Sequence, residues 1–154
     1  MELATELERL RQLEVELARR ARAAGDVQSD REARRICEAI AMQSEARASS
    51  AEAWAREYGE ARAQGPDVSV VLDLTEGSGG ELEKGSGPHL MALRTVVIRS
   101  DRAWAAVGRA ARASGRSQLM DLVGAARADL HDALTWLDLR PEVEVRTRPA
   151  RRLA

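Results

Sequence analysis

The sequence GPDVSVVLDLTEGSGGELEKGSGPH, at residues 65–89, decides how this chain is divided. Its first part is rich in valine and leucine, and its second part is rich in glycine and serine, so neither part has helical character. Long stretches of alanine, arginine, glutamate and leucine lie on both sides of it. The segment therefore separates two helical pairs, each of which is expected to form a hairpin.

Before this segment, apolar residues recur every three or four positions, which predicts amphipathic helices at residues 2–24 and 30–63. We expect Gly25 to end the first helix as its C-terminal cap, because glycine tolerates the left-handed conformation found there. Ser29 and Glu32 have the spacing of a capping box at the start of the second helix. Together these features predict the first helical hairpin.

The outer half of the second predicted helix lacks large aliphatic residues. Beyond Arg47 its apolar face is carried by alanines together with Trp54 and Tyr58. Alanine side chains let helices approach closely but bury little apolar area, so this half is expected to need a partner surface.

After the segment, helices are predicted at residues 89–113 and 117–138, with Ser114 and Gly115 in the turn and Ser117 as a cap. The last helix has a broad apolar stripe that suits a bundle core, formed by Leu119, Leu122, Val123, Ala126, Leu130, Ala133, Leu134 and Leu137.

The helix predicted at residues 89–113 repeats its apolar positions every seven residues over three heptads. One core position holds Leu90, Val97, Trp104 and Ala111, and the other holds Leu93, Ser100 and Val107. Residues 94–99 (RTVVIR) are also rich enough in β-branched side chains to form a strand. The heptad repeat favours the helix.

The fold class predicted from these elements is mainly α, a four-helix bundle built from two helical hairpins. A small β element is expected from residues 68–74, with residues 143–147 as a second candidate strand. The alternative is an α+β fold in which residues 68–74, 94–99 and 143–147 form one small sheet. We expect residues 1–139 to form a single helical domain that includes the insert at 65–88, followed by a basic arm at 140–154.

Composition limits the classes of protein that the chain can represent. The 154 residues carry a net charge of −1, which gives no overall electrostatic attraction to nucleic acid or to an anionic membrane. Phenylalanine and asparagine are absent and Lys84 is the only lysine, which indicates a GC-rich bacterial or phage genome. A single cysteine, Cys37, and an N-terminus without a secretory signal lead us to expect a cytoplasmic protein.

No catalytic, cofactor or metal motif is complete in this sequence. The glycine-rich segment lacks the GxxxxGK[ST] order of a phosphate-binding loop, because Lys84 precedes Gly85. His131 and Asp132 resemble the dipeptide of metal-dependent phosphohydrolases, but His89 is the only other histidine. Cys37 lies on the apolar face of its helix, where a packing thiol is expected. We therefore expect no catalytic residues, no cofactor and no metal, and a protein that is not an enzyme.

Two oppositely charged segments are the candidate binding elements. The insert is acidic, the C-terminal arm is basic, and the candidate partner-binding residues are Glu76, Glu81, Glu83, Arg146, Arg148, Arg151 and Arg152. The leading hypothesis is a non-enzymatic helical subunit of a larger assembly, which binds a protein partner or other copies of itself. A nucleic-acid-associated protein that uses the basic arm is the first alternative. A small hydrolase or ligand-binding bundle, with polar residues that converge only in three dimensions, is the second.

Overall fold

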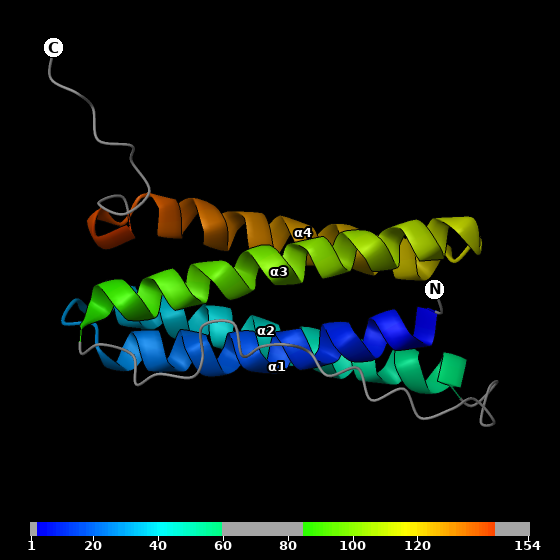
Figure 1. The fold of residues 1–154 in the computed structure, drawn as a ribbon, viewed down its shortest axis with the longest axis horizontal. Coiled ribbons are helices and arrows are strands. Elements are labelled where there is room, and N and C mark those ends of the chain that lie inside the picture. Colours follow the sequence, from blue (N-terminus) through cyan, green and yellow to red (C-terminus); the bar gives the residue numbers. More distant parts are fainter. Residues whose placement is uncertain (1–2, 60–84, 144–154) are drawn as a thin grey trace, which may run out of the picture.

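The computed structural model describes residues 3–59 and 85–143. These residues form four helices, α1 (Leu3–Asp26), α2 (Arg31–Gly59), α3 (Ser86–Ala113) and α4 (Ser117–Asp138). The helix α1 packs against α2, and α3 packs against α4, so both predicted hairpins are present (Figure 1). The helix α1 also packs along α3, which joins the two hairpins. The chain is thus mainly helical, and its helices pack as in a bundle.

The predicted β element is not shown, since no strand occurs within residues 3–59 and 85–143. Residues 68–74 and 144–147 lie outside the described residues, as do residues 60–63 of the second predicted helix. Val143 lies in a helical turn at residues 141–143, where its amide donates a hydrogen bond to the carbonyl of Arg140 at 3.1 Å.

The α+β alternative is wrong for residues 94–99, which lie in the middle of α3. All the residues that hold the two heptad core positions of this helix are buried: Leu90, Leu93, Val97, Ser100, Trp104, Val107 and Ala111. Burial of this continuous face outweighs the weak strand preference of the valines and isoleucine. The helix begins earlier than predicted, at Ser86, with Pro88 in its first turn.

The predicted cap at Gly25 is wrong, because α1 continues through this residue to Asp26. Gly25 is instead buried where α1 meets α2. A Cβ atom at this position would lie 3.1 Å from the Cβ of Cys37, which is closer than such contacts normally allow. The glycine therefore permits the close approach of the two helices rather than ending the first one.

The start of α2 is capped by Asp30, so the predicted capping box of Ser29 and Glu32 is wrong. The Asp30 carboxylate accepts hydrogen bonds from the amides of Glu32 at 3.1 Å and Ala33 at 3.4 Å. The sequence offers two capping residues in succession here, and the carboxylate adds a charge that the helix N-terminus favours.

The turn between α3 and α4 is closed by backbone hydrogen bonds. Gly115 has φ +66°, its amide donates to the carbonyl of Arg112, and the Arg116 amide donates to the carbonyl of Ala111. This is a Schellman motif, in which glycine takes the left-handed position. The tight turn places Arg116 at the N-terminal cap of α4, so the prediction that Ser117 caps this helix is wrong.

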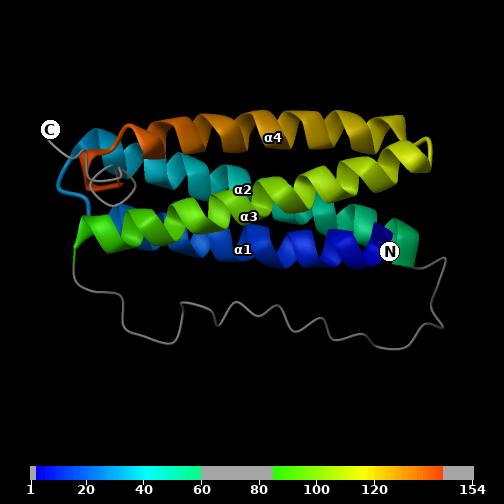
Figure 2. The ribbon, with the colours of Figure 1, turned by 45° about the horizontal axis from the view of Figure 1, so that its top comes forward.

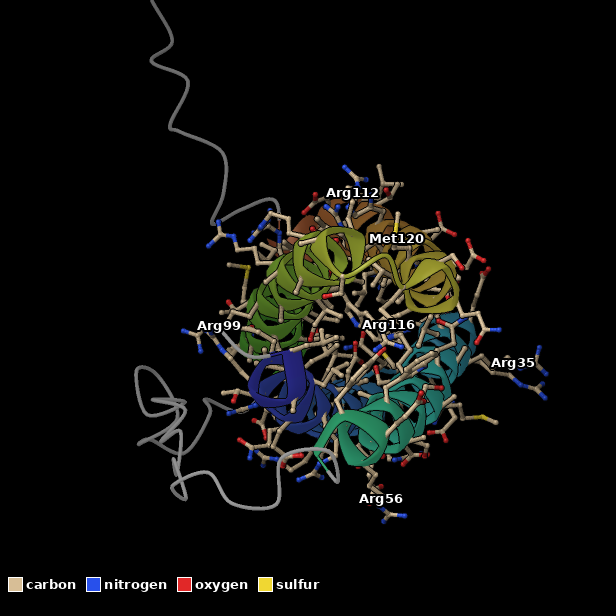
Figure 3. The ribbon with its side chains drawn as sticks, turned by 90° about the vertical axis from the view of Figure 1, so that its right-hand side faces the viewer. Arg35, Arg56, Arg99, Arg112, Arg116 and Met120 are labelled. Atoms are coloured by element: carbon tan, nitrogen blue, oxygen red, sulfur yellow. The ribbon has the colours of Figure 1, made fainter. Side chains whose placement is uncertain are left out.

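The helices α2 and α3 run in the same direction, so the end of α2 and the start of α3 lie at opposite ends of the molecule (Figures 1 and 2). Around the bundle the order is α2, α1, α3 and α4. The helices α2 and α4 touch at only a few positions, so the side of the bundle between them is the most weakly packed. Figure 3, along the helix axes, shows Arg116 pointing into the space between the hairpins at one end.

Candidate functional site

None of the sequence-predicted binding residues lies in the described part of the chain. The three glutamates and four arginines proposed to meet a partner fall within residues 60–84 and 144–154. The candidate sites below were not predicted and come from residues within the helices.

A charged cluster lies inside the bundle, where α1, α2 and α3 meet. The side chain of Glu14 in α1 is 0% exposed, and that of Arg47 in α2 is 7% exposed. Arg47 donates from Nε to Glu14 Oε1 at 3.0 Å and from Nη2 to Oε2 at 3.1 Å, which makes a two-point ion pair. The indole Nε1 of Trp104 in α3 donates to Glu14 Oε1 at 2.7 Å.

Most of the polar atoms in this cluster have a hydrogen-bond partner. Arg47 Nη2 also donates to the hydroxyl of Ser44 at 3.0 Å. Arg47 Nη1 is buried without a hydrogen-bond partner, and the Asp129 carboxylate of α4 lies 3.9 Å from it. The cluster therefore links all four helices. Because both oxygens of Glu14 already accept hydrogen bonds, this carboxylate is engaged in holding the bundle together.

A second charged cluster lies on the surface between α3 and α4. Asp101 accepts hydrogen bonds from Arg127 at 2.8 and 3.3 Å, and its carboxylate lies 3.2 Å from Nε2 of His131. Partial burial acts to raise the pKa of Asp101, but the hydrogen bonds and charges of Arg127 and His131 outweigh it and lower the pKa. His131 lies on an exposed helix face.

Beside this cluster, α3 and α4 form a surface groove of about 580 Å³. Its floor is made by small residues and its margins by cationic ones. The residues that line it are Ala105, Gly108, Arg109, Arg112, Met120, Val123, Gly124, Arg127, Ala128 and His131. None of them is acidic. Arg112 and Met120 point outward on this side of the bundle (Figure 3). We call this feature the α3–α4 groove.

Two glycines give the groove its shape in different ways. A Cβ atom at Gly108 would lie 3.0 Å from Cγ1 of Val123, so this glycine lets α3 and α4 approach closely. A Cβ atom at Gly124 would meet nothing within 4 Å. Gly124 is thus open to the groove, and the helix backbone there is accessible to another chain.

The arginines at the margin differ in their partners. Arg127 is paired with Asp101, and His131 shares that carboxylate. In contrast, neither Arg109 nor Arg112 has an ion-pair partner among the described residues, and both side chains are exposed. The groove therefore presents two unpaired guanidinium groups, each with several fixed donors suited to carboxylates.

A second hollow, of about 410 Å³, lies at the turn between α1 and α2. Arg31, Arg34 and Arg35 line it, but Asp26 and Glu38 line it as well. Its remaining arginine, Arg22, is paired with Glu45 and Glu38. Charges of both signs are mixed here, so this hollow is a weaker candidate for an anionic partner.

Cys37 has the properties of a packing residue. Its side chain is fully buried, and burial raises the pKa of the thiol to about 11. Within the described residues, no three His, Cys, Asp or Glu side chains come together in a way that could hold a metal ion. None of the described helices is both long enough and apolar enough to cross a membrane.

At the end of the bundle near the α3–α4 turn, aromatic residues join the hairpins. The rings of Trp54 and Tyr58 stack with centroids 5.9 Å apart. The Arg116 guanidinium lies 5.0 Å from the centre of the Tyr58 ring, in a cation–π contact. Part of the alanine-rich half of α2 is thus covered by the second hairpin of the same chain.

Comparison with known proteins adds no relative: no protein family, curated protein or solved structure matches this chain. The candidate sites therefore rest on the geometry described above.

Proposed function

We propose that this protein is a non-enzymatic interaction subunit that joins an assembly of several copies of itself by binding an acidic protein surface in the α3–α4 groove. The observation that carries the proposal is the pair Arg109 and Arg112, exposed beside a floor of small residues and without carboxylate partners in the described structure. Exposed arginines beside an accessible helix backbone suit a polypeptide partner that supplies carboxylates.

The buried cluster supports an interaction role over an enzymatic one. Glu14 is the most deeply buried carboxylate near other polar groups, and its hydrogen-bonding capacity is used by Arg47 and Trp104. A general acid or base must reach a substrate proton, and Glu14 is 0% exposed. The cluster fixes the positions of the helices that carry the groove.

The test is the molar mass of the full chain in solution, measured by size-exclusion chromatography with light scattering over a range of protein concentrations. The wild-type chain should form species larger than a monomer, and Arg109→Glu with Arg112→Glu should return it to a monomer. Arg35→Glu is the matched control, because Arg35 is also an exposed arginine and lies on another side of the bundle (Figure 3). A wild-type chain that stays monomeric throughout, or equal behaviour of the two variants, would refute the proposal.

A further inference from the structure

The α3–α4 groove has chemical features that narrow the choice of partner. Its margin is cationic, its floor consists of small residues, and Met120 gives it a half-buried apolar side chain. No aromatic side chain lines it, so it offers no platform on which nucleic-acid bases could stack. A groove of this composition suits a polypeptide segment that carries both carboxylates and aliphatic residues.

A stretch of that composition lies in the same chain, between α2 and α3. Residues 67–83 (DVSVVLDLTEGSGGELE) carry no basic residue, and their carboxylates are Asp67, Asp73, Glu76, Glu81 and Glu83. The same segment has aliphatic side chains between Asp67 and Glu76, which suit Met120 and the small residues of the floor. Charge and apolar character therefore both match the groove.

We propose that residues 67–83 of one copy dock in the α3–α4 groove of a second copy. The inference rests on the proposed function and names its partner. The groove and the segment are different parts of the chain, so the contact is heterologous: a copy whose segment is docked can still accept the segment of a further copy in its own groove. Assembly by this route should grow with protein concentration and weaken with salt, because exposed ion pairs are screened.

Complementation between two defective chains tests the docking directly. The first variant, Arg109→Glu with Arg112→Glu, keeps the segment and loses the groove. The second, Asp73→Asn with Glu76→Gln, Glu81→Gln and Glu83→Gln, keeps the groove and loses the segment. Each should be monomeric alone by light scattering, and their mixture should form a one-to-one complex.

The same variants distinguish failure of the docking inference from failure of the proposed function. A mixture that stays monomeric while wild type assembles means that the segment does not dock between copies, and the inference alone falls. A wild type that stays monomeric at every concentration overturns both proposals. If the groove variant is monomeric but the segment variant still assembles, the proposed function stands with another partner and the inference falls. If removing residues 144–154 abolishes assembly and the groove variant does not, the basic arm is the contact and both proposals fall.

A peptide measurement gives the strength of the contact. A fluorescent peptide of residues 65–86 should bind the segment variant, whose own segment cannot compete. Adding Arg109→Glu and Arg112→Glu to that variant should weaken peptide binding by about tenfold or more, because two attractive charges are replaced by two that repel the carboxylates of the peptide. Adding Arg35→Glu instead should leave it within about twofold. Equal weakening by both would show non-specific charge attraction and overturn the inference.

Discussion

The α1–α2 hairpin buries an ion pair in the interior of the bundle, whereas the ion pairs of the α3–α4 hairpin lie at the surface. Glu8, Glu16 and Glu52 each hold an arginine one turn away, and Glu14 holds Arg47 in the interior. In α3–α4 the interior faces are mainly apolar, while Arg109 and Arg112 face solvent. The two hairpins therefore differ in where their charges lie: the first contributes the buried ion pair of Glu14 and Arg47, and the second carries the α3–α4 groove.

The largest expected effect on stability comes from removing one partner of the buried ion pair between Glu14 and Arg47. Glu14→Ala should lower the free energy of unfolding by about 3–5 kcal/mol, because it leaves the buried guanidinium of Arg47 without its counter-charge. Urea denaturation followed by circular dichroism measures this. The control is the double variant Glu14→Leu with Arg47→Met, which replaces the pair by apolar side chains and should cost far less. A loss below about 1 kcal/mol for Glu14→Ala would mean that the pair is not buried.

Trp104 tests the place where the two hairpins meet. Trp104→Ala should cost about 3–5 kcal/mol, because it removes a fully buried indole and its hydrogen bond to Glu14. Trp136→Ala is the comparison, since Trp136 is only partly buried against the core, and its cost should be clearly smaller. The same denaturation measurement applies, and equal costs would contradict the burial of Trp104.

Cys37 tests whether water is excluded from the first hairpin where α2 contacts Gly25 of α1. The pKa of its thiol is about 11 in the folded chain against an ordinary value of 9.0, so the folded state disfavours the thiolate. The contribution of the Cys37 thiol to the free energy of unfolding is therefore fully present below pH 9, and it should be lost as the pH rises from 9 to 11. A tenfold difference in acidity between the folded and unfolded thiol corresponds to roughly 1.4 kcal/mol of stability. Denaturation at several pH values should show this fall in wild type and a smaller one in Cys37→Ala.

The smallest effects concern the two glycines beside the groove. Gly124→Ala should stabilise the protein by up to about 1 kcal/mol, because alanine is the better helix former and the added methyl meets nothing. Gly108→Ala gains the same propensity but pushes against Val123, so this variant should be the less stable of the two. Thermal unfolding of both variants measures the difference. A reversed order would show that α3 and α4 are less closely packed than described.

The second hairpin was predictable from the sequence almost completely. The heptads of α3 and the broad stripe of α4 are apolar without a break apart from Ser100, so periodicity alone locates both helices and most of their buried residues. The residues at the turns were harder, because Ser29 and Asp30, or Arg116 and Ser117, are neighbours that compete for one cap position. Backbone geometry decides between such neighbours, and a sequence pattern does not contain it.

The buried ion pair was missed although the sequence held a signal for it. Glu14 occupies the place between Leu10 and Leu17 in the stripe of α1, and Arg47 occupies the place between Ser44 and Ala51 in α2. Charged residues in a helix are normally assigned to the solvent side, which hides such a pair. Opposite charges that interrupt the apolar stripes of two helices in a hairpin are the pattern to look for.

The α3–α4 groove could not be predicted in the same way. Gly108, Gly124 and the arginines beside them come from two helices, and only the packing of α3 on α4 brings them to one surface. The sequence pointed instead to charged segments at residues 65–88 and 140–154, most of which lie outside the described residues.

The parallel course of α2 and α3 sets a minimum length for the connection between them. The 28 residues of α3, at about 1.5 Å each, make the bundle about 42 Å long. An extended chain covers that distance with about 13 residues at roughly 3.3 Å each, and residues 60–85 number about twice as many. Shortening the connection below that length would force α3 to exchange with a neighbouring molecule. Cutting the connection would create two separate hairpins. The affinity of one hairpin for the other would then measure the contacts between them without the contribution of the covalent link.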